Sequence, residues 1–248
     1  MRAATLPRIH LDRPLAVGAA FDLPAGQSRH VQVLRLQPGD ALTLFNGAGW
    51  EWRARVVQMS RAAVGVQVEA RVDIDRELAR HVTLALGMPA NERMDGLVEK
   101  ATELGVGAIR PLVCERSVLR LAGERAEKRL ARWRAVAIAA SEQSGRTRVP
   151  EVHAVQTLTD WLEAAGATAP VETRRFVLSP IAATRWNADA AGPSGTALAF
   201  LSGPEGGLSP AEEEAARRSG FVPVSLGARV LRADTAPLAM LAVCGIEF

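Results

Sequence analysis

The chain has 248 residues, of which 48% are hydrophobic, and a formal net charge of +3. This composition supports a well-buried core and excludes an intrinsically disordered chain. No apolar run approaches the roughly 20 residues of a membrane-spanning helix, and the first residues lack the apolar run of a secretory signal. Two cysteines are too few for a disulfide framework or a structural zinc site, so we expect both to be buried packing residues. We therefore expect a cytoplasmic protein that binds neither a membrane nor a metal.

The charge is unevenly distributed along the chain. Residues 1–71 contain nine arginines and five acidic residues, and residues 110–148 contain ten basic and four acidic residues. Basic surfaces of this kind suit a phosphate-bearing partner, because each neutralised phosphate releases counterions. The alternative is that arginine merely replaces lysine, of which the chain has two. Charge alone leaves both interpretations open.

Residues 1–71 predict a small β-barrel domain. Short runs of β-branched and aromatic residues, separated by turn residues such as Asn46-Gly47, are typical of strands. A helical segment is predicted over SRHVQVLRLQ, ending before Pro38. The charged residues 72–80 interrupt the pattern and are the expected linker. The four predicted strands are residues 18–24, 40–47, 50–60 and 63–72.

After this linker, strands and helices are predicted to alternate. Such an order is typical of an α/β domain, in which helices cover a mostly parallel sheet. Ser209 is expected to cap one helix, with Pro210 in its first turn. Residues 182–196 are expected to form an exposed loop. The predicted strands are residues 81–88, 108–114, 174–179, 196–203 and 222–227, and the predicted helices are residues 91–106, 123–145, 209–220 and 231–247.

Ligands of open α/β sheets bind beyond the carboxyl ends of the strands, where three loops of this chain are expected. The loops are residues 178–180, 202–207 and 225–227. The second contains three glycines within five residues, which permits close approach of backbone to a ligand. It matches neither phosphate-binding glycine pattern. Taken alone, this loop is as well explained by an ordinary Gly-Pro turn.

Six segments, spread in order along nearly the whole chain, carry recurrent motifs. They are QSRHVQVLRLQPGDALTLF at 27–45, EKATELGV at 99–106, ERSV at 115–118, SEQSGR at 141–146, LSGPEGGLSPAEEE at 201–214 and SLGARVLRADTAPLAML at 225–241. Their combination resembles the ribosomal small-subunit methyltransferase E family of the SPOUT superfamily, in which the glycine-rich loop is followed by the stretch S-L-G-x-R-I/V-L-R-x-E-T-A.

This resemblance implies a PUA-like β-barrel domain for RNA at 1–71 and a SPOUT-type α/β domain with a C-terminal trefoil knot at 76–248. It also implies a homodimer that binds S-adenosyl-L-methionine and methylates N3 of a uridine in 16S rRNA, supplied as naked rRNA or as the assembled small subunit. The cofactor contacts carried over by motif are Leu178, Gly203, Pro204, Glu205, Gly206, Gly207, Leu226, Gly227 and Leu231.

Methylation at N3 requires removal of the N3 proton and stabilisation of the resulting uracil anion. In the RVLRADTAP segment, Asp234 is the candidate base and Arg232 the candidate anion stabiliser. The family usually has Glu at the position of Asp234, so the shorter carboxylate leaves Glu103 and Glu142 as alternative bases. The candidate RNA contacts are His30, Arg35, Arg116, Arg146 and Arg229, although each is also explained as a solvated or structural residue.

Three alternatives are weighed against this function. The first is a SPOUT enzyme acting on another RNA, such as a tRNA ribose 2′-O-methylase. The predicted N-terminal domain and the TELG and SEQSGR segments disfavour it. The second is a non-catalytic RNA-binding relative, which would not need the glycine-rich loop. The third is an oxidoreductase with a nucleotide cofactor, whose glycine fingerprint is absent from the sequence.

Overall fold

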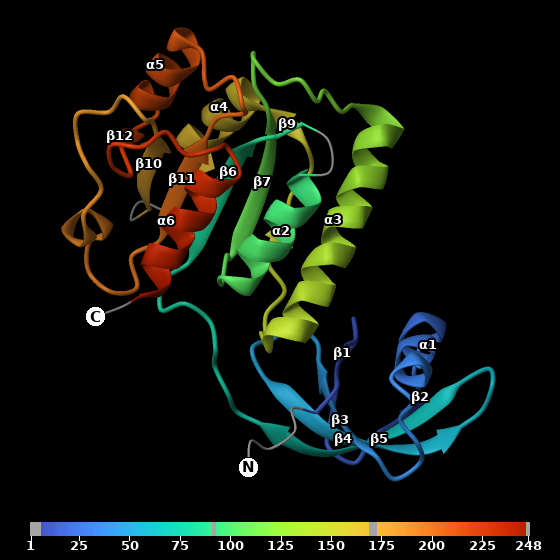
Figure 1. Cartoon of the computed structure of the whole chain (residues 1–248). Coiled ribbons are helices and arrows are strands. Elements are labelled where there is room, and N and C mark those ends of the chain that lie inside the picture. The colour runs from blue at the N-terminus through green and yellow to red at the C-terminus, as the bar shows by residue number, and fades with distance from the viewer. Residues whose placement is uncertain (1–5, 91–92, 169–172, 247–248) are drawn as a thin grey trace. The chain divides into compact units, whose positions relative to one another are not determined.

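The computed structural model describes residues 6–90, 93–168 and 173–246. The chain divides into two compact units, and the first consists of Met1–Glu77 together with Ser141–Val149. The second consists of Leu78–Ala140 and Pro150–Phe248. Figure 1 shows the blue strands of the first unit and the green-to-red strands and helices of the second. The SEQSGR segment therefore belongs to the first unit, whereas the sequence predicts that it lies in the second domain.

The first unit is a five-stranded sheet in the order β1-β3-β4-β5-β2, with β1 parallel to β3 and the other pairs antiparallel. In β4, buried Trp52, Ala54 and Val56 alternate with the exposed Arg53 and Arg55, as expected of a half-buried strand. The three-residue β1 was not predicted. The elements are β1 (Arg8–His10), β2 (Ala20–Asp22), α1 (Ala25–Val33), β3 (Ala41–Phe45), β4 (Glu51–Met59) and β5 (Val64–Val72).

Helix α1 ends earlier than the sequence predicted. Arg35 adopts a left-handed backbone with φ of 58°, and the Leu36 N–H donates to the Val31 carbonyl at 3.4 Å. This arrangement closes a helix without any role for Pro38. Such a position favours glycine, so an arginine there carries a small backbone strain.

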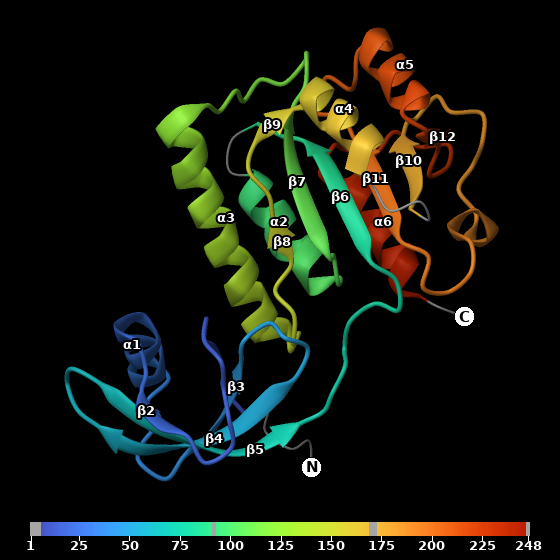
Figure 2. The ribbon, with the colours of Figure 1, turned by 180° about the vertical axis from the view of Figure 1, so that it is seen from behind.

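The second unit contains a parallel sheet in the order β12-β10-β11-β6-β7-β8, and β9 also pairs with β7. Every residue of β11 is buried, as expected of a central parallel strand. Figures 1 and 2 show α2 and α6 on one face of this sheet and α4 on the other, beside α5. The strands are β6 (Val82–Gly87), β7 (Ala108–Val113), β8 (Glu151–Val152), β9 (Gln156–Thr157), β10 (Arg174–Leu178), β11 (Leu198–Ser202) and β12 (Val222–Val224).

The helices of the second unit largely follow the prediction. They are α2 (Arg93–Glu103), α3 (Gly123–Ser144), α4 (Leu158–Thr168), the short 3₁₀ helix η1 (Ala188–Ala191), α5 (Pro210–Arg218) and α6 (Thr235–Gly245). Ser209 caps α5, and its side chain and that of Glu212 form a capping box that confirms the predicted start. Helix α6 begins at Thr235, so the predicted helix at 231–247 started too early. The first residues of the predicted helix at 91–106 lie outside the described residues.

Helix α4 and the strands β8 and β9 were not predicted from the sequence. The two strands have two residues each and are defined by their pairing with β7. Helix α4 buries Leu158, Trp161 and Leu162 against the sheet, and this i, i+3, i+4 spacing was a usable signal.

Both cysteines are buried and free, as predicted. Burial, together with the charge of Glu212, raises the pKa of the Cys114 thiol to about 12, so this thiol stays neutral at physiological pH. Within the ranges that the structure describes, no helix is long and apolar enough to cross a membrane.

Candidate active site

The register of the parallel sheet brings three strand ends to one edge. Leu178, the last residue of β10, pairs with Ser202 at the end of β11 and with Val224 at the end of β12. Ser202 also pairs with Leu86 near the end of β6. The loops that follow β10, β11 and β12 therefore begin side by side, at the edge where α/β proteins bind their ligands.

These loops enclose a cavity of about 310 Å³. This volume falls in the range of small-molecule sites, roughly 300–1,000 Å³. Leucines provide apolar walls, and arginine and glutamate side chains are present in the lining. The lining residues are Arg116, Leu178, Ser179, Pro180, Ile181, Ser202, Gly203, Pro204, Glu205, Gly207, Leu208, Glu213, Val224, Leu226, Arg229, Val230, Leu231, Arg232, Ala233 and Ala236.

Two glycines allow the loop at 203–208 to pack tightly at this edge. A Cβ on Gly203 would lie 2.8 Å from the Leu208 nitrogen and 2.9 Å from the Gly207 carbonyl carbon, because the loop folds back on itself. A Cβ on Gly87, at the end of β6, would lie 2.5 Å from Pro204 Cδ. Gly207 has φ of +70°, and a Cβ there would meet open space. Close packing therefore requires glycine at Gly203 and Gly87, and the positive φ favours glycine at Gly207.

Comparison with known proteins identifies the family. An RNA methyltransferase domain matches residues 76–245, and an RNA methyltransferase PUA domain matches residues 23–69. The ribosomal RNA small subunit methyltransferase E of Synechocystis sp. is 35% identical over 235 residues, which cover 91% of this chain and 73% of the relative. The Bacillus subtilis protein of the same name is 31% identical, covering 92% of this chain and 90% of the relative. This chain belongs to the ribosomal RNA small subunit methyltransferase E family.

Solved structures agree with this assignment. A ribosomal RNA small subunit methyltransferase E from Neisseria gonorrhoeae, bound to S-adenosyl methionine, has a TM-score of 0.87 and 36% identity, covering 96% of each chain. A putative methyltransferase from Legionella pneumophila, in complex with the same cofactor, has a TM-score of 0.89 and 31% identity, covering 97% of each chain. The α/β fold with a parallel sheet and a PUA-like N-terminal domain, predicted from the resemblance, is confirmed.

In this methyltransferase E chain, most of the predicted cofactor residues meet at the cavity. The lining includes Leu178, Gly203, Pro204, Glu205, Gly207, Leu226 and Leu231. Gly206 and Gly227 are not among the lining residues that the structure describes. Ser179 and Glu213 also line the cavity but were not among the predicted cofactor contacts, and the Ser179 hydroxyl lies 3.5 Å from Glu213 Oε1. Ser179 could have been predicted as a lining residue, because it follows the end of a strand. The sequence around Glu213 indicated helix capping and nothing about a ligand.

The two candidate groups for chemistry at N3 differ in position. Arg232 is exposed and lines the cavity. Asp234 is the residue before α6, is half-buried, and lies outside the described lining. Its side chain makes no cap hydrogen bond and lies 3.5 Å from the Thr235 hydroxyl. Asp234 is therefore close in sequence to the lining residues, and its side chain does not cap helix α6.

The two alternative bases lie elsewhere. Glu103, at the end of α2, pairs with Lys100 at 2.9 Å and lies outside the described lining. Glu142 is part of the first unit, where its Oε1 accepts a hydrogen bond from the His10 backbone N–H at 2.8 Å. Burial raises the pKa of the Glu142 carboxyl, partly offset by this bond and by the nearby His30 and Arg8 charges. The cavity in the second unit is therefore formed without either carboxylate.

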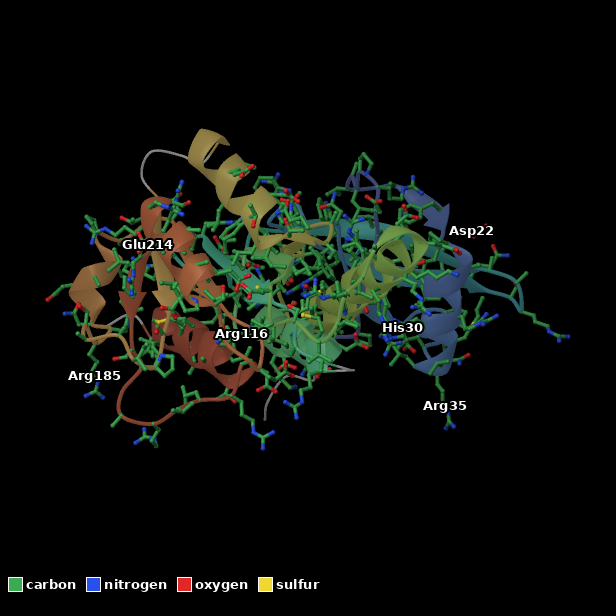
Figure 3. All side chains as sticks on the ribbon, turned by 90° about the horizontal axis from the view of Figure 1, so that it is seen from above. Asp22, His30, Arg35, Arg116, Arg185 and Glu214 are labelled. Carbon is green, nitrogen blue, oxygen red and sulfur yellow. The ribbon has the colours of Figure 1, made fainter. Side chains whose placement is uncertain are left out.

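The predicted RNA contacts divide into buried and exposed groups. The side chain of Arg146 is only 4% exposed and binds Glu77, with Nε to Oε2 at 3.0 Å. An arginine buried in an ion pair is not available to RNA phosphates, so this expectation is corrected. His30 lies 3.8 Å from Glu142, and Arg35 projects away from the ribbon (Figure 3). Arg229 is exposed and lines the cavity.

Proposed function

We propose that this chain transfers a methyl group from S-adenosyl-L-methionine to N3 of a uridine in 16S rRNA. The observation that carries the proposal is the cavity at the carboxyl edge of the sheet, formed by the loops whose sequences characterise the family. Its leucine walls suit the apolar parts of the cofactor, and the open space beside Gly207 leaves room for a ligand close to the backbone. The residues present therefore fit this cofactor.

When bound, the cofactor supplies a methyl group activated by a positively charged sulfur. The chain must then hold the uracil in line with that methyl, remove the N3 proton and stabilise the anion. Arg232 is the candidate for the last task, because its exposed guanidinium belongs to the cavity wall. We propose Asp234 as the group that accepts the proton. Within the described lining, the carboxylates are Glu205 and Glu213.

Deletion of the gene tests the proposal in the cell. Nucleoside mass spectrometry of small-subunit rRNA is expected to show loss of 3-methyluridine in the deletion strain. The mark should return when the wild-type gene is restored. An unchanged nucleoside profile would contradict the proposed function, and loss of a different methylated nucleoside would assign the enzyme to another target.

Asp234→Asn tests the proposed base. The methylation rate is expected to fall about 100-fold, the share typical of a general base, with little change in cofactor affinity. Raising the pH should partly restore the rate, because hydroxide then removes the N3 proton. Asp234→Glu, the residue usual in the family, should remain active. Glu213→Gln is the matched control, and a larger loss in that variant than in Asp234→Asn would move the role to Glu213.

We propose that the substrate, as 16S rRNA or as the assembled small subunit, is bound by an RNA-binding domain at 1–71 and modified by a methyltransferase domain at 76–248. The exposed arginines of the first unit, including Arg35 and Arg53, support this assignment through charge. A protein that acts on ribosomal RNA would work in the cytoplasm.

We also propose that the C-terminal segment forms the trefoil knot, and an experimental trace of residues 178–236 would test the threading.

We propose that the enzyme is a homodimer whose subunits meet along α6. This helix buries Pro237, Met240 and Leu241 within its own subunit, yet Val243 is 47% exposed. Beside it lies a hollow of about 380 Å³ that shares Leu226 and other residues with the cofactor cavity. Light scattering at micromolar concentration should give a mass near twice 26.4 kDa. A mass of one chain would contradict the proposal.

A further inference from the structure

The turn after β7 is held by its own hydrogen bonds. The Ser117 N–H donates to the Cys114 carbonyl at 3.0 Å, and the Cys114 N–H donates to the Ser117 hydroxyl at 2.9 Å. Both residues are buried. The glycine-rich loop follows β11, and β6 lies between β11 and β7 in the sheet. The turn is therefore fixed by its own hydrogen bonds. It follows a strand that lies two positions from β11 in the sheet.

Two consecutive residues of the turn bond to the segment that follows β11. The Glu115 N–H donates to Glu212 Oε1 at 2.7 Å, while Glu212 Oε2 accepts from the Ser209 N–H at 2.9 Å within the capping box of α5. Arg116 Nη1 donates to the carbonyl oxygens of Gly206 at 3.1 Å and Leu208 at 3.2 Å. The turn therefore holds both the loop and the start of the helix that follows it.

The position of Arg116 also explains Gly206. A Cβ on Gly206 would lie 3.1 Å from Arg116 Cβ and 3.6 Å from Arg116 Cδ, so the arginine stem lies directly against this glycine. On its other side, the loop is tied by Glu205, whose Oε1 accepts from the Ala90 N–H at 2.9 Å. Gly206 thus serves the packing of Arg116, although it lies outside the described lining.

We propose that Arg116 is a positioning residue for S-adenosylmethionine, which braces the loop at 203–208 in the conformation that binds the cofactor. The inference rests on the proposed function, and it gives Arg116 a role other than the RNA contact expected from the sequence. A charged guanidinium that donates to two carbonyls restricts the loop before the ligand arrives. Without this brace, binding must order the loop, and the ordering cost lowers affinity.

Three variants test the brace. Arg116→Gln removes the double donor, Arg116→Lys keeps the charge and a donor, and Arg125→Gln removes an equal charge from an exposed position on α3. The dissociation constant for S-adenosylmethionine is measured by calorimetry. Hydrogen exchange of the loop amides is measured without ligand, where the Gly207 N–H is normally protected by its bond to the Pro204 carbonyl at 2.8 Å.

In Arg116→Gln, the loop amides should exchange faster and cofactor affinity should fall about 10- to 100-fold, the range for charge-assisted hydrogen bonds. Arg116→Lys should recover part of both, and Arg125→Gln should change neither. If Arg116→Gln fails to fold, Gly206→Ala provides the same test by displacing the arginine stem.

Unchanged loop exchange and unchanged cofactor affinity in Arg116→Gln would overturn the proposal. Failure of the wild-type protein to bind S-adenosylmethionine would instead contradict the proposed function. The exchange measurement uses protein without ligand. It therefore tests whether Arg116 restrains the loop even if the wild-type protein does not bind S-adenosylmethionine.

Discussion

Gly203→Ala is expected to weaken S-adenosylmethionine binding about 10- to 100-fold, which corresponds to roughly 1–3 kcal/mol of steric cost at a closely packed position. The new Cβ would lie 2.8 Å from the Leu208 nitrogen and 2.9 Å from the Gly207 carbonyl carbon. These are backbone atoms, so no side-chain rotation relieves the collision. The loop must open, and its altered shape changes the wall of the proposed cofactor cavity.

Calorimetry with S-adenosylmethionine measures the effect, and thermal unfolding shows whether the change is confined to the site. Gly96→Ala is the matched control, because Gly96 lies within α2 of the same unit and a Cβ there meets nothing within 4 Å. Alanine at that position should leave affinity unchanged and slightly favour the helix. Equal affinities of Gly203→Ala and the wild type would mean that the loop does not shape the cofactor site.

Glu51→Ala is expected to lower the free energy of unfolding of the first unit by about 3–5 kcal/mol, the usual cost of removing one partner from a buried ion pair. The Glu51 side chain is 11% exposed and binds both Arg8 and Arg76. The Arg8 side chain is 6% exposed, and its Nη2 also donates to the Arg146 carbonyl at 2.8 Å. Its charge would remain buried without a carboxylate partner.

Hydrogen exchange of the β4 and β5 amides across a urea series measures this unit separately from the other. Glu69→Ala is the control, because it removes a carboxylate of the same sheet whose pair with Arg55 is exposed. That change should cost less than about 1 kcal/mol. A loss in Glu51→Ala no larger than in Glu69→Ala would show that the buried pair contributes little.

The same carboxylate makes the first unit sensitive to acid. Burial by itself raises the pKa of Glu51, but hydrogen bonds and charges from Arg76 and Arg8 outweigh it, so the pKa lies below 4.5. The resulting stability is present above pH 4.5 and is lost as the pH falls through the folded pKa. Glu142, with its raised pKa, acts in the opposite direction, so we expect the clearest effect in a Glu142→Gln background. In that background, the free energy of unfolding of the first unit should fall less steeply with decreasing pH when Glu51→Gln is also introduced.

The sequence by itself determined many of the local elements and the order of the motifs. The apolar spacing of residues 91–106 and the Ser209-Pro210 helix start depend on neighbours within a few residues, so they were predictable. The loops at 178–180, 202–207 and 225–227 were also predictable as a set. Parallel strands place their carboxyl ends at one edge whatever their order in the sheet.

Only the tertiary structure decided which charged side chains are available to a ligand. Arg116 follows Glu115 and Arg146 follows Gly145, and nothing in the local sequence of either arginine shows whether its side chain is paired within the protein. Their partners lie far along the chain: Gly206 and Leu208 for Arg116, and Glu77 for Arg146. The same holds for Glu142, whose bond to the His10 backbone places it in the first unit. Burial and pairing come from contacts between distant segments, and local sequence patterns do not encode those contacts.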